Sequence, residues 1–244
     1  MMDSGSYDSA PRQLALDVGL TDDATFDNYY LPLNGGGNAQ VVEQLKVQLQ
    51  PFGEQSIFLW GAQGVGVTHL LQAACLHASQ RGFSAIYLAL DEQGRFQPDA
   101  VVDGLEHNQL VCLDNVDAVL GQPRWETALF HLFNRVRDLG GRMLWSAACG
   151  PHELAVSLPD LASRLSWGLV FQVQPLSDDD KMDALAMRAR NLGLELSPEV
   201  AQFIQHRCSR NLGELYDVLR RLDQASLSEQ RRLTVPFVKQ VLGI

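Results

Sequence analysis

The sequence predicts an α/β domain with a parallel sheet, followed by a smaller all-helical domain. Up to Pro175, short apolar runs typical of buried strands alternate with segments of helix length. Parallel strands need long crossover connections, so strands separated by helices favour a parallel sheet. After Pro175 only helical patterns remain. We therefore divide the chain into a flexible tail (1–22), an α/β domain (23–175) and a helical domain (176–244).

Five strands and three intervening helices are expected in the α/β domain. Each strand is a short apolar run, and the runs are found at 56–60, 84–90, the start of 109–119, 142–148 and 169–174. The helices are expected over 68–82, 99–107 and 125–140. In the first of them apolar residues recur at helical spacing, and Gly82 ends it.

The C-terminal domain is expected to contain four helices, near 177–192, 198–208, 211–227 and 235–242. The first begins with a typical start signal. Ser177 can act as the N-cap, and the three aspartates after it suit the positive end of the helix dipole.

The N-terminal residues differ in composition from the rest of the chain. Residues 1–12 are small and polar and include a proline, which predicts disorder. The stretch QLALDV (13–18) then forms a short apolar island in this tail. Taken alone, such a hexapeptide is either an ordinary tail segment or a peptide that docks in the groove of a partner.

The composition argues against several classes of protein. The formal net charge is −10, which disfavours non-specific binding to nucleic acid or to an anionic membrane, since that binding depends on Lys and Arg. The four cysteines form no C-x-x-C pair, so disulfide and zinc sites are disfavoured. No apolar run reaches the roughly 18 residues of a membrane span, and the start shows no signal-peptide pattern. A cytoplasmic protein is expected.

The stretch from Gly61 to Thr68 nearly matches a nucleotide-binding P-loop. The pattern is G-x-x-x-x-G-K-[ST], and Val67 occupies the lysine position. The stretch follows a predicted strand and opens a predicted helix, which is the context that such a loop requires. Backbone N–H groups from Gly64 to Thr68 can hold a phosphate without a side-chain charge. The alternative is a glycine-rich turn that binds nothing.

A second motif supports nucleotide binding. The apolar strand that ends at Asp114 has the Walker B arrangement, in which the carboxylate holds Mg²⁺ through water beside the P-loop. Thr68 would supply a hydroxyl to the same ion. Taken alone, Asp114 is more commonly a strand-end turn residue. Together the two motifs predict a phosphate site formed by Gln63, Gly64, Val65, Gly66, Val67, Thr68, His69 and Asp114.

These motifs and four further segments resemble the AAA+ replication initiators of bacteria, and most closely the Hda group of DnaA-related regulators. TFDNYY, near residue 25, resembles a box that lies near the nucleotide base. The segment 158–181 resembles the arginine-finger box followed by the start of the lid, and LTVPFVKQVL resembles the C-terminal part of the Hda group. In the tail, Gln13, Leu14 and Leu16 resemble the contact residues of a sliding-clamp-binding peptide.

The resemblance covers nearly the whole chain and implies an α/β AAA+ P-loop domain with a five-stranded parallel sheet and a helical lid. It implies two partners, DnaA and the DNA polymerase III sliding clamp (beta subunit). Arg164 would be an arginine finger that stimulates hydrolysis of DnaA-bound ATP in trans, preventing re-initiation. The chain would then be nucleoid-associated through the clamp, with any contact to DNA indirect or weak.

The chain departs from this group at several positions that assist catalysis. Val67 replaces the lysine and Asn115 the second Walker B acid. The sensor 1 position corresponds to Ala147 or Ala148. The sensor 2 arginine position corresponds to Gly213, with Arg210 one turn earlier as a substitute nucleotide contact. We therefore expect a nucleoside diphosphate, ADP, with or without Mg²⁺, bound as a structural ligand between the domains, and no efficient ATPase activity of the chain alone.

Arg164 is expected to be exposed at the edge of the α/β domain, near the junction with the lid. The alternative is a structural arginine that caps a helix or pairs with Asp160. Two other functions stay open, an active ATPase in which another residue replaces the lysine and an adaptor or loader that binds DNA or the initiator without a finger. The sequence does not decide between a monomer and a homodimer.

Overall fold

The computed structural model describes residues 24–32, 36–93, 96–208, 211–229 and 231–244. The residues predicted to bind a sliding clamp, Gln13, Leu14 and Leu16, lie outside these ranges, as does Arg210. Within them no helix is both long and apolar enough to cross a membrane.

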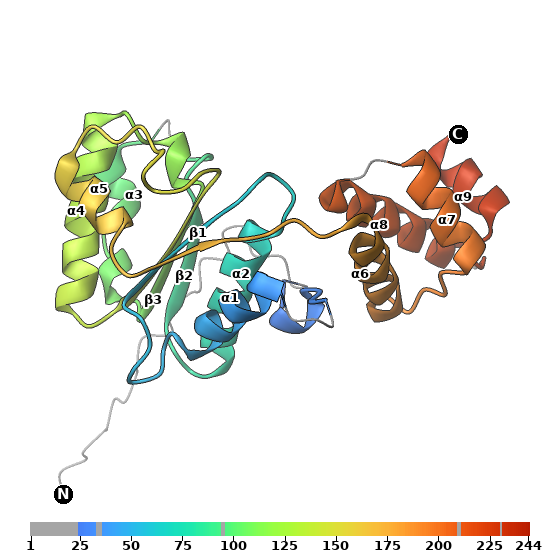
Figure 1. Ribbon diagram of the computed structural model, residues 1–244, viewed down its shortest axis with the longest axis horizontal. Helices are drawn as coiled ribbons and strands as arrows, with labels where there is room; N and C mark the ends of the chain where they lie inside the picture. Colours follow the sequence, from blue (N-terminus) through green and yellow to red (C-terminus); the bar gives the residue numbers. More distant parts are fainter. Residues whose placement is uncertain (1–23, 33–35, 94–95, 209–210, 230) are drawn as a thin grey trace, which may run out of the picture.

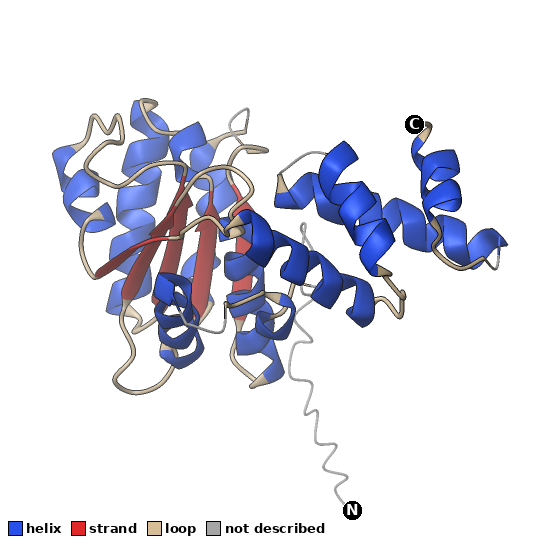
Figure 2. Cartoon of the chain, turned by 45° about the vertical axis from the view of Figure 1, so that its right-hand side comes forward, coloured by secondary structure: helices blue, strands red, loops and turns tan. Residues whose placement is uncertain are grey.

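The α/β domain contains the expected five-stranded parallel sheet (Figure 2). Its strands are β1 (Ser56–Trp60), β2 (Ala85–Ala89), β3 (Leu110–Asp114), β4 (Arg142–Ala147) and β5 (Leu169–Gln172). The spatial order is β2-β3-β4-β1-β5, and every neighbouring pair is parallel. The carboxyl ends of β1 and β3 therefore lie at the same edge of the sheet, on either side of β4.

Helices cover both faces of the sheet because its strands are apolar on both sides. In β1, Ile57 and Leu59 pack with α1 (Gly36–Val47) and α2 (Val67–Gln80). Phe58 points to the opposite face and joins the core formed with three helices, α3 (Pro98–Val102), α4 (Pro123–Asp138) and α5 (Pro159–Leu165). Alternate residues of one strand thus build the two halves of the core.

Three differences from the expected elements have local causes. The helix expected over 99–107 is split into α3 and the 3-10 turn η2 (Leu105–His107), because Gly104 between them adopts a φ of +78°. Helix α1 was not expected, since it begins with two glycines, which are poor helix formers. Helix α5 was not expected as a separate element, and it has only 7 residues. Two more 3-10 turns, η1 (Phe26–Asn28) and η3 (Val116–Ala118), complete the domain.

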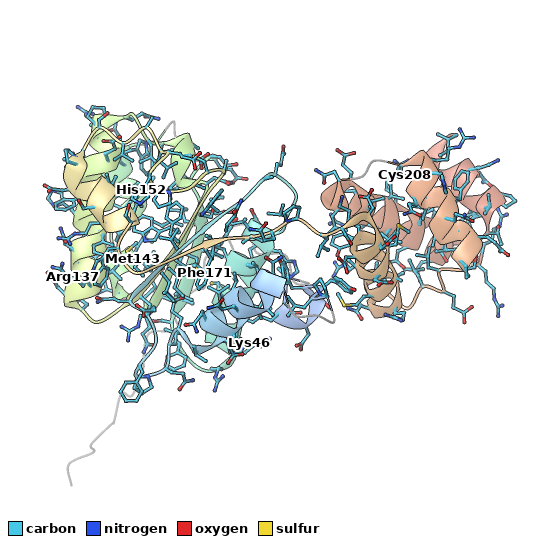
Figure 3. The ribbon with its side chains drawn as sticks, in the orientation of Figure 1. Lys46, Arg137, Met143, His152, Phe171 and Cys208 are labelled. Carbon is cyan, nitrogen blue, oxygen red and sulfur yellow. The ribbon has the colours of Figure 1, made fainter. Side chains whose placement is uncertain are left out.

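The lid contains the four predicted helices, α6 (Asp178–Asn191), α7 (Pro198–Arg207), α8 (Leu212–Glu229) and α9 (Val235–Leu242). The predicted cap is present, because the Ser177 hydroxyl accepts the Asp180 N–H at 3.1 Å. The lid has its own apolar core, in which Leu185, Ile204, Leu219 and Phe237 are fully buried. Figure 3 shows Cys208 within this unit, whereas Met143 and Phe171 lie on the sheet.

The lid and α5 lie on opposite sides of the α/β domain. In Figure 1 the lid stands to the right, next to α1 and α2, whereas α5 packs with α4 at the far left. After α5 the chain runs through β5 toward the lid and enters α6. Any side chain on α5 is therefore remote from the junction between the domains.

Candidate functional site

The glycine loop between β1 and α2 has the backbone geometry that a phosphate loop requires. Gly64 and Gly66 have φ angles of +85° and +95°, in the left-handed region that favours glycine. A Cβ on Gly66 would lie 2.8 Å from the Tyr29 ring, so its hydrogen is needed for close packing as well as for backbone conformation. Helix α2 begins at Val67. Its first N–H groups have no partner within the helix and suit an anion.

The loop borders a cavity of about 650 Å³, which is within the usual size of a small-molecule site. Of the predicted nucleotide contacts, the cavity is lined by Gln63, Gly64, Val65, Gly66, Val67, Thr68, His69 and Gly213. Sequence reasoning did not assign other lining residues, namely Asn28, Tyr29, Tyr30, Asp91, Asp117, Ser146, Leu176, Leu212 and Tyr216. The TFDNYY segment was a signal for the first three of these.

Asp114 lies at the end of β3, as the Walker B motif predicted, but its carboxylate is occupied by neighbours. The residue is 1% exposed and is not part of the cavity lining. The Tyr87 hydroxyl donates to one carboxylate oxygen at 2.8 Å, and the Ser146 hydroxyl donates to the other. Burial and the adjacent carboxylate raise the pKa of Tyr87, so its hydroxyl stays protonated as the donor. Asp114 is thus a buried anchor between β2, β3 and β4.

Ser146, next to the two predicted sensor 1 candidates, supplies the polar contact at the end of β4. Ala147 and Ala148 line the cavity, but the polar side chain that reaches Asp114 belongs to Ser146. Its oxygen also accepts the N–H of Asn115 at 2.9 Å, and Asn115 adopts a φ of +56°. The strand pairing explains this contact: Leu113 lies opposite Trp145, so the next residues along β3 and β4 meet. A single serine in an otherwise apolar strand was the signal in the sequence.

The described lining of the cavity has an unusual charge for a phosphate site. It includes two exposed carboxylates, Asp91 and Asp117, and neither a lysine nor an arginine. Val67, at the lysine position, is half-buried and packs against the apolar core on the α1 and α2 side. The backbone of the loop therefore supplies the favourable electrostatics without help from a described cationic side chain.

His69 lines the cavity, but its ring is used to hold a neighbouring segment. The Nε2 atom lies 2.8 Å from the carbonyl oxygen of Thr25 and must donate to it, since a carbonyl is only an acceptor. Burial lowers the pKa of His69, only partly opposed by this hydrogen bond, so the ring favours its neutral form. This nitrogen is therefore not available to a phosphate, and the predicted contact of His69 with the phosphates stays a prediction for the rest of its ring.

The segment that contains η1 joins the glycine loop to the lid. The Tyr29 hydroxyl donates to the Val65 carbonyl at 3.4 Å. Toward the lid, the Asn191 amide donates to Asn28 Oδ1 at 2.7 Å, and the Tyr30 hydroxyl donates to Asp183 at 3.3 Å. The two domains thus meet around the mouth of the cavity.

The lid also touches the glycine loop directly. A Cβ placed on Gly64 would lie 2.8 Å from the Asn211 side-chain amide, just before α8. Asn211 Oδ1 accepts the N–H groups of Gly213 and Glu214 at the start of that helix. Tyr216, one turn further along α8, lines the cavity, and burial raises its pKa to about 12. The loop, η1 and α8 therefore enclose the cavity from three sides.

Arg164 lies in the last turn of α5, far from this cavity. Its guanidinium is 5.5 Å from the centre of the Phe133 ring, its side chain is half-buried, and its buried Nε has no hydrogen-bond partner. No ion pair joins it to Asp160, although both residues are described. The expected position near the lid is wrong, because α5 packs with α4 on the side of the α/β domain that is far from the lid.

A buried carboxylate fixes the position of α5. Glu126, on α4, is 1% exposed and accepts the N–H groups of Ser157 at 3.0 Å and Leu158 at 2.7 Å. Leu158 is the N-cap residue of α5. Glu126 also accepts the Gly121 N–H at 2.8 Å, so its charge is balanced by backbone donors. The segment that precedes Arg164 is therefore tied to α4.

The cavity fits a nucleotide in size and in backbone geometry. The glycine loop and the start of α2 would face the phosphates, and the exposed Thr68 hydroxyl would be available to a metal ion that accompanies them. Asp114 could contact this ion directly only if the Tyr87 or Ser146 hydroxyl moved away from its carboxylate. The residues present thus suit binding of a phosphorylated ligand. They suit its hydrolysis less well, because Val67 stands at the lysine position and Asn115 at the position of the second acid.

The chain matches two family models that together cover most of its length. Residues 20–172 match the bacterial DnaA ATPase domain, and residues 178–242 match the lid domain of Hda. Domain III of the replication initiation protein DnaA from Thermotoga maritima is similar in structure, with a TM-score of 0.77, 22% identity, and coverage of 92% of this chain and 98% of that chain.

Two further solved structures extend the comparison. AMPPCP-bound DnaA from Aquifex aeolicus has a TM-score of 0.70 and 26% identity, covering 86% of this chain and 68% of that chain. The RuvB Holliday junction branch migration motor of Thermotoga maritima shares the fold at 14% identity and a TM-score of 0.63, covering 90% of this chain and 71% of that chain. The chain belongs to the bacterial DnaA ATPase domain family, in an Hda-like form with an Hda-type lid.

Proposed function

We propose that this protein is a regulator of replication initiation that stimulates hydrolysis of the ATP bound to DnaA. The observation that carries the proposal is the combination, in one chain, of a DnaA-type α/β domain with an Hda-type lid. The expected result is ADP-bound DnaA and no second initiation. The protein would act in the cytoplasm, at the chromosome, where a sliding clamp would hold it through Gln13, Leu14 and Leu16.

Arg164 is proposed as the arginine finger of this reaction. It is on α5, on the side of the sheet away from the cavity of its own chain, which suits a group that acts on the nucleotide of a neighbour. Its guanidinium is permanently charged and forked, so it can donate two hydrogen bonds to a transferring phosphoryl group. Fingers supplied in trans raise the rate of hydrolysis by about 10³ to 10⁵-fold in other phosphoryl-transfer systems.

The chain's own cavity is proposed to bind ADP as a structural ligand. Bound there, ADP would gain its phosphate contacts from the glycine loop and its base contacts from the η1 segment and α8. Because Val67 leaves a γ-phosphate without its usual cation, ADP should bind more tightly than ATP. Binding to the folded state should raise the free energy of unfolding by about 2.7 kcal/mol at 100 times the dissociation constant.

The second candidate function is an adaptor or loader that binds DnaA or DNA without a finger. It is favoured by one observation, the stacking of Arg164 on Phe133 with its Nε buried, which is also how a structural arginine is held. In this case the surface around α5 would bind the partner, but the charge of Arg164 would not take part in hydrolysis.

The deciding experiment measures hydrolysis of DnaA-bound ATP in the presence of clamp loaded on DNA. Arg164→Ala and Arg164→Lys should both lose most of the stimulation while keeping the melting temperature, ADP affinity and clamp pull-down of the unchanged protein. Arg124→Ala, an exposed arginine on α4, is the matched control and should stimulate normally. Normal stimulation by a folded Arg164→Ala protein would remove the finger and favour the adaptor.

The clamp contact has its own test. Replacing Leu14 and Leu16 together by alanine should abolish clamp pull-down, because each buried leucine contributes roughly 1.5–3 kcal/mol. The fold and ADP affinity should not change, since the substitutions lie in the predicted tail. Unchanged pull-down would show that the clamp contact lies elsewhere in the chain.

A further inference from the structure

The charge of the cavity lining sets a condition on any phosphorylated ligand. Asp91 follows β2 and Asp117 lies in η3, and both carboxylates are exposed at the cavity. No lysine or arginine is found among the described lining residues. His69 favours its neutral form and uses its Nε2 proton for the Thr25 carbonyl. The described side chains around the cavity therefore carry net negative charge.

The favourable part of the electrostatics comes from the backbone alone. The glycine loop and the start of α2 offer N–H groups, which attract a phosphate by their partial charges. A P-loop lysine would add a full positive charge next to the β-phosphate, but Val67 packs into the apolar core instead. A nucleoside diphosphate without a metal ion brings several negative charges into the cavity. Two carboxylates repel these charges, and no described cationic side chain of the lining attracts them.

Resting on the proposed nucleotide-binding function, we propose that Asp91 and Asp117 make the cavity selective for the divalent metal complex of a nucleotide and against the metal-free nucleotide. A bound metal ion lowers the negative charge of the phosphates and so weakens their repulsion by the two carboxylates. Thr68 lies at the end of the glycine loop, in the first turn of α2, and is exposed. Its neutral hydroxyl can contact such an ion.

The metal ion has to arrive with the nucleotide, because the chain has not assembled a site for it. Within the described ranges, no three His, Cys, Asp or Glu side chains gather as a metal-binding cluster. The Asp114 carboxylate, which would be the strongest anchor, is buried and bonded to Tyr87 and Ser146. Asp91 and Asp117 therefore act as selectivity residues, through their charge, and the metal–nucleotide complex is the unit that binds.

The experiment is a calorimetric titration of the full chain, freed of nucleotide, with ADP in MgCl₂ and with ADP in EDTA. Adenosine serves as the uncharged probe. We expect chelation to weaken ADP binding by about 100-fold or more, since neither a described cationic side chain nor a metal then offsets the like charges. The affinity for adenosine should be the same in both buffers, because no phosphate is present to be repelled.

The carboxylates are tested one at a time in EDTA. Asp91→Asn and Asp117→Asn should each strengthen metal-free ADP binding by about 3- to 10-fold, as expected for removal of one like charge in a partly solvated site. Asp99→Asn, at an exposed position on α3 outside the lining, changes the net charge equally and should have no effect. Thermal shifts with the same ligands give a second readout that does not involve DnaA.

Each outcome decides between this inference and the function on which it rests. Equal ADP affinity with and without Mg²⁺ would overturn the inference and leave nucleotide binding intact, since another part of the chain would then be neutralising the phosphates. The inference is also overturned if Asp91→Asn and Asp117→Asn behave like Asp99→Asn. If ADP fails to bind in either buffer, nucleotide binding at this cavity is wrong, and the selectivity is wrong with it.

Discussion

The glycine-loop cavity and the surface around α5 belong to the same domain but have opposite chemistry. The cavity lies between the α/β domain and the lid, and its described wall has two exposed carboxylates and no lysine or arginine. Helix α5 packs with α4 on the far side of the sheet and carries Arg164 over an aromatic ring. The described wall of the chain's own cavity thus lacks a cationic side chain, whereas α5 carries one on the far side of the domain.

This difference bears on which nucleotide the Arg164 side chain could contact. Helix α5 packs on one face of the sheet, whereas the cavity lies at the carboxyl ends of the strands next to the lid, so Arg164 lies away from a nucleotide bound by the same chain. A cavity with backbone donors and like-charged walls suits a ligand that is held rather than hydrolysed. The expectation that the chain alone is not an efficient ATPase rests on this separation as well as on Val67 and Asn115.

The largest expected effect concerns the support of α5. Glu126→Ala removes a buried carboxylate that accepts three backbone N–H groups, and each buried N–H left without a partner should lower the free energy of unfolding by about 1–3 kcal/mol. Urea unfolding measures this. Glu126→Gln keeps one acceptor oxygen and should cost less. If Glu126→Ala unfolds at the same urea concentration as the unchanged chain, these hydrogen bonds do not hold α5.

The next largest effect is expected when a positive charge is added to the glycine loop. Val67→Lys should strengthen ATP binding more than ADP binding, because each hydrogen bond to a charged group contributes about 1.5–3 kcal/mol, or roughly tenfold to a hundredfold in affinity. Calorimetric titration of both nucleotides measures the change. Val67→Met fills similar space without charge and is the control. A lysine that leaves the ATP to ADP affinity ratio unchanged would mean that the phosphates lie elsewhere.

A smaller effect is expected from the ring beneath Arg164. Phe133→Leu keeps an apolar side chain in the core and should cost less than about 1.5 kcal/mol in stability. It also removes a cation–π contact of about 0.5–1 kcal/mol that helps to orient the guanidinium. Stimulation of DnaA should therefore fall more than it does for Phe130→Leu, a partly buried position on the same helix. Equal stimulation by the two variants would separate the ring from the finger.

The smallest expected effect is a change in pH dependence at the cavity. Burial lowers the pKa of His69 below the usual value near 6.5, so in that range the unfolded chain binds more protons than the folded chain. Stability should therefore fall as the pH falls below about 6.5. His69→Gln should make this decline shallower, although His77, whose pKa is also lowered by burial, keeps part of it. Thermal unfolding between about pH 5 and 7 tests the slope, and an identical slope in both proteins would contradict the assignment.

Local sequence signals predicted much of the fold. The five strands and the four lid helices were visible as apolar runs and helical spacing, and the family resemblance is confirmed by two family models. The loop glycines were visible because a left-handed backbone has a strong residue preference. Helix α1 was not visible in the sequence, since the glycines at its start weaken the helical pattern. Tertiary packing stabilises this helix.

The candidate site was predicted only where one segment forms it. The loop residues from Gln63 to Thr68 line the cavity, as a local motif implies. The contact of Ser146 with Asp114 was not predicted, because it depends on the register between β3 and β4. His69 was expected at the phosphates, but a carbonyl 44 residues earlier in the chain takes its ring nitrogen. Such contacts between distant segments leave no periodic trace in the sequence.

The sequence by itself determined the fold class, the position of the glycine loop and the absence of a lysine from it, because spacing and residue type are local properties. Tertiary structure decided which groups meet. It placed Asp91 and Asp117 from separate segments at one cavity, enclosed Asp114 between Tyr87 and Ser146, and moved Arg164 to the face opposite the lid. The physical reason is that the charge of a wall, and the side of a sheet on which a helix packs, depend on strand order and register, which are set by the folding of the whole chain.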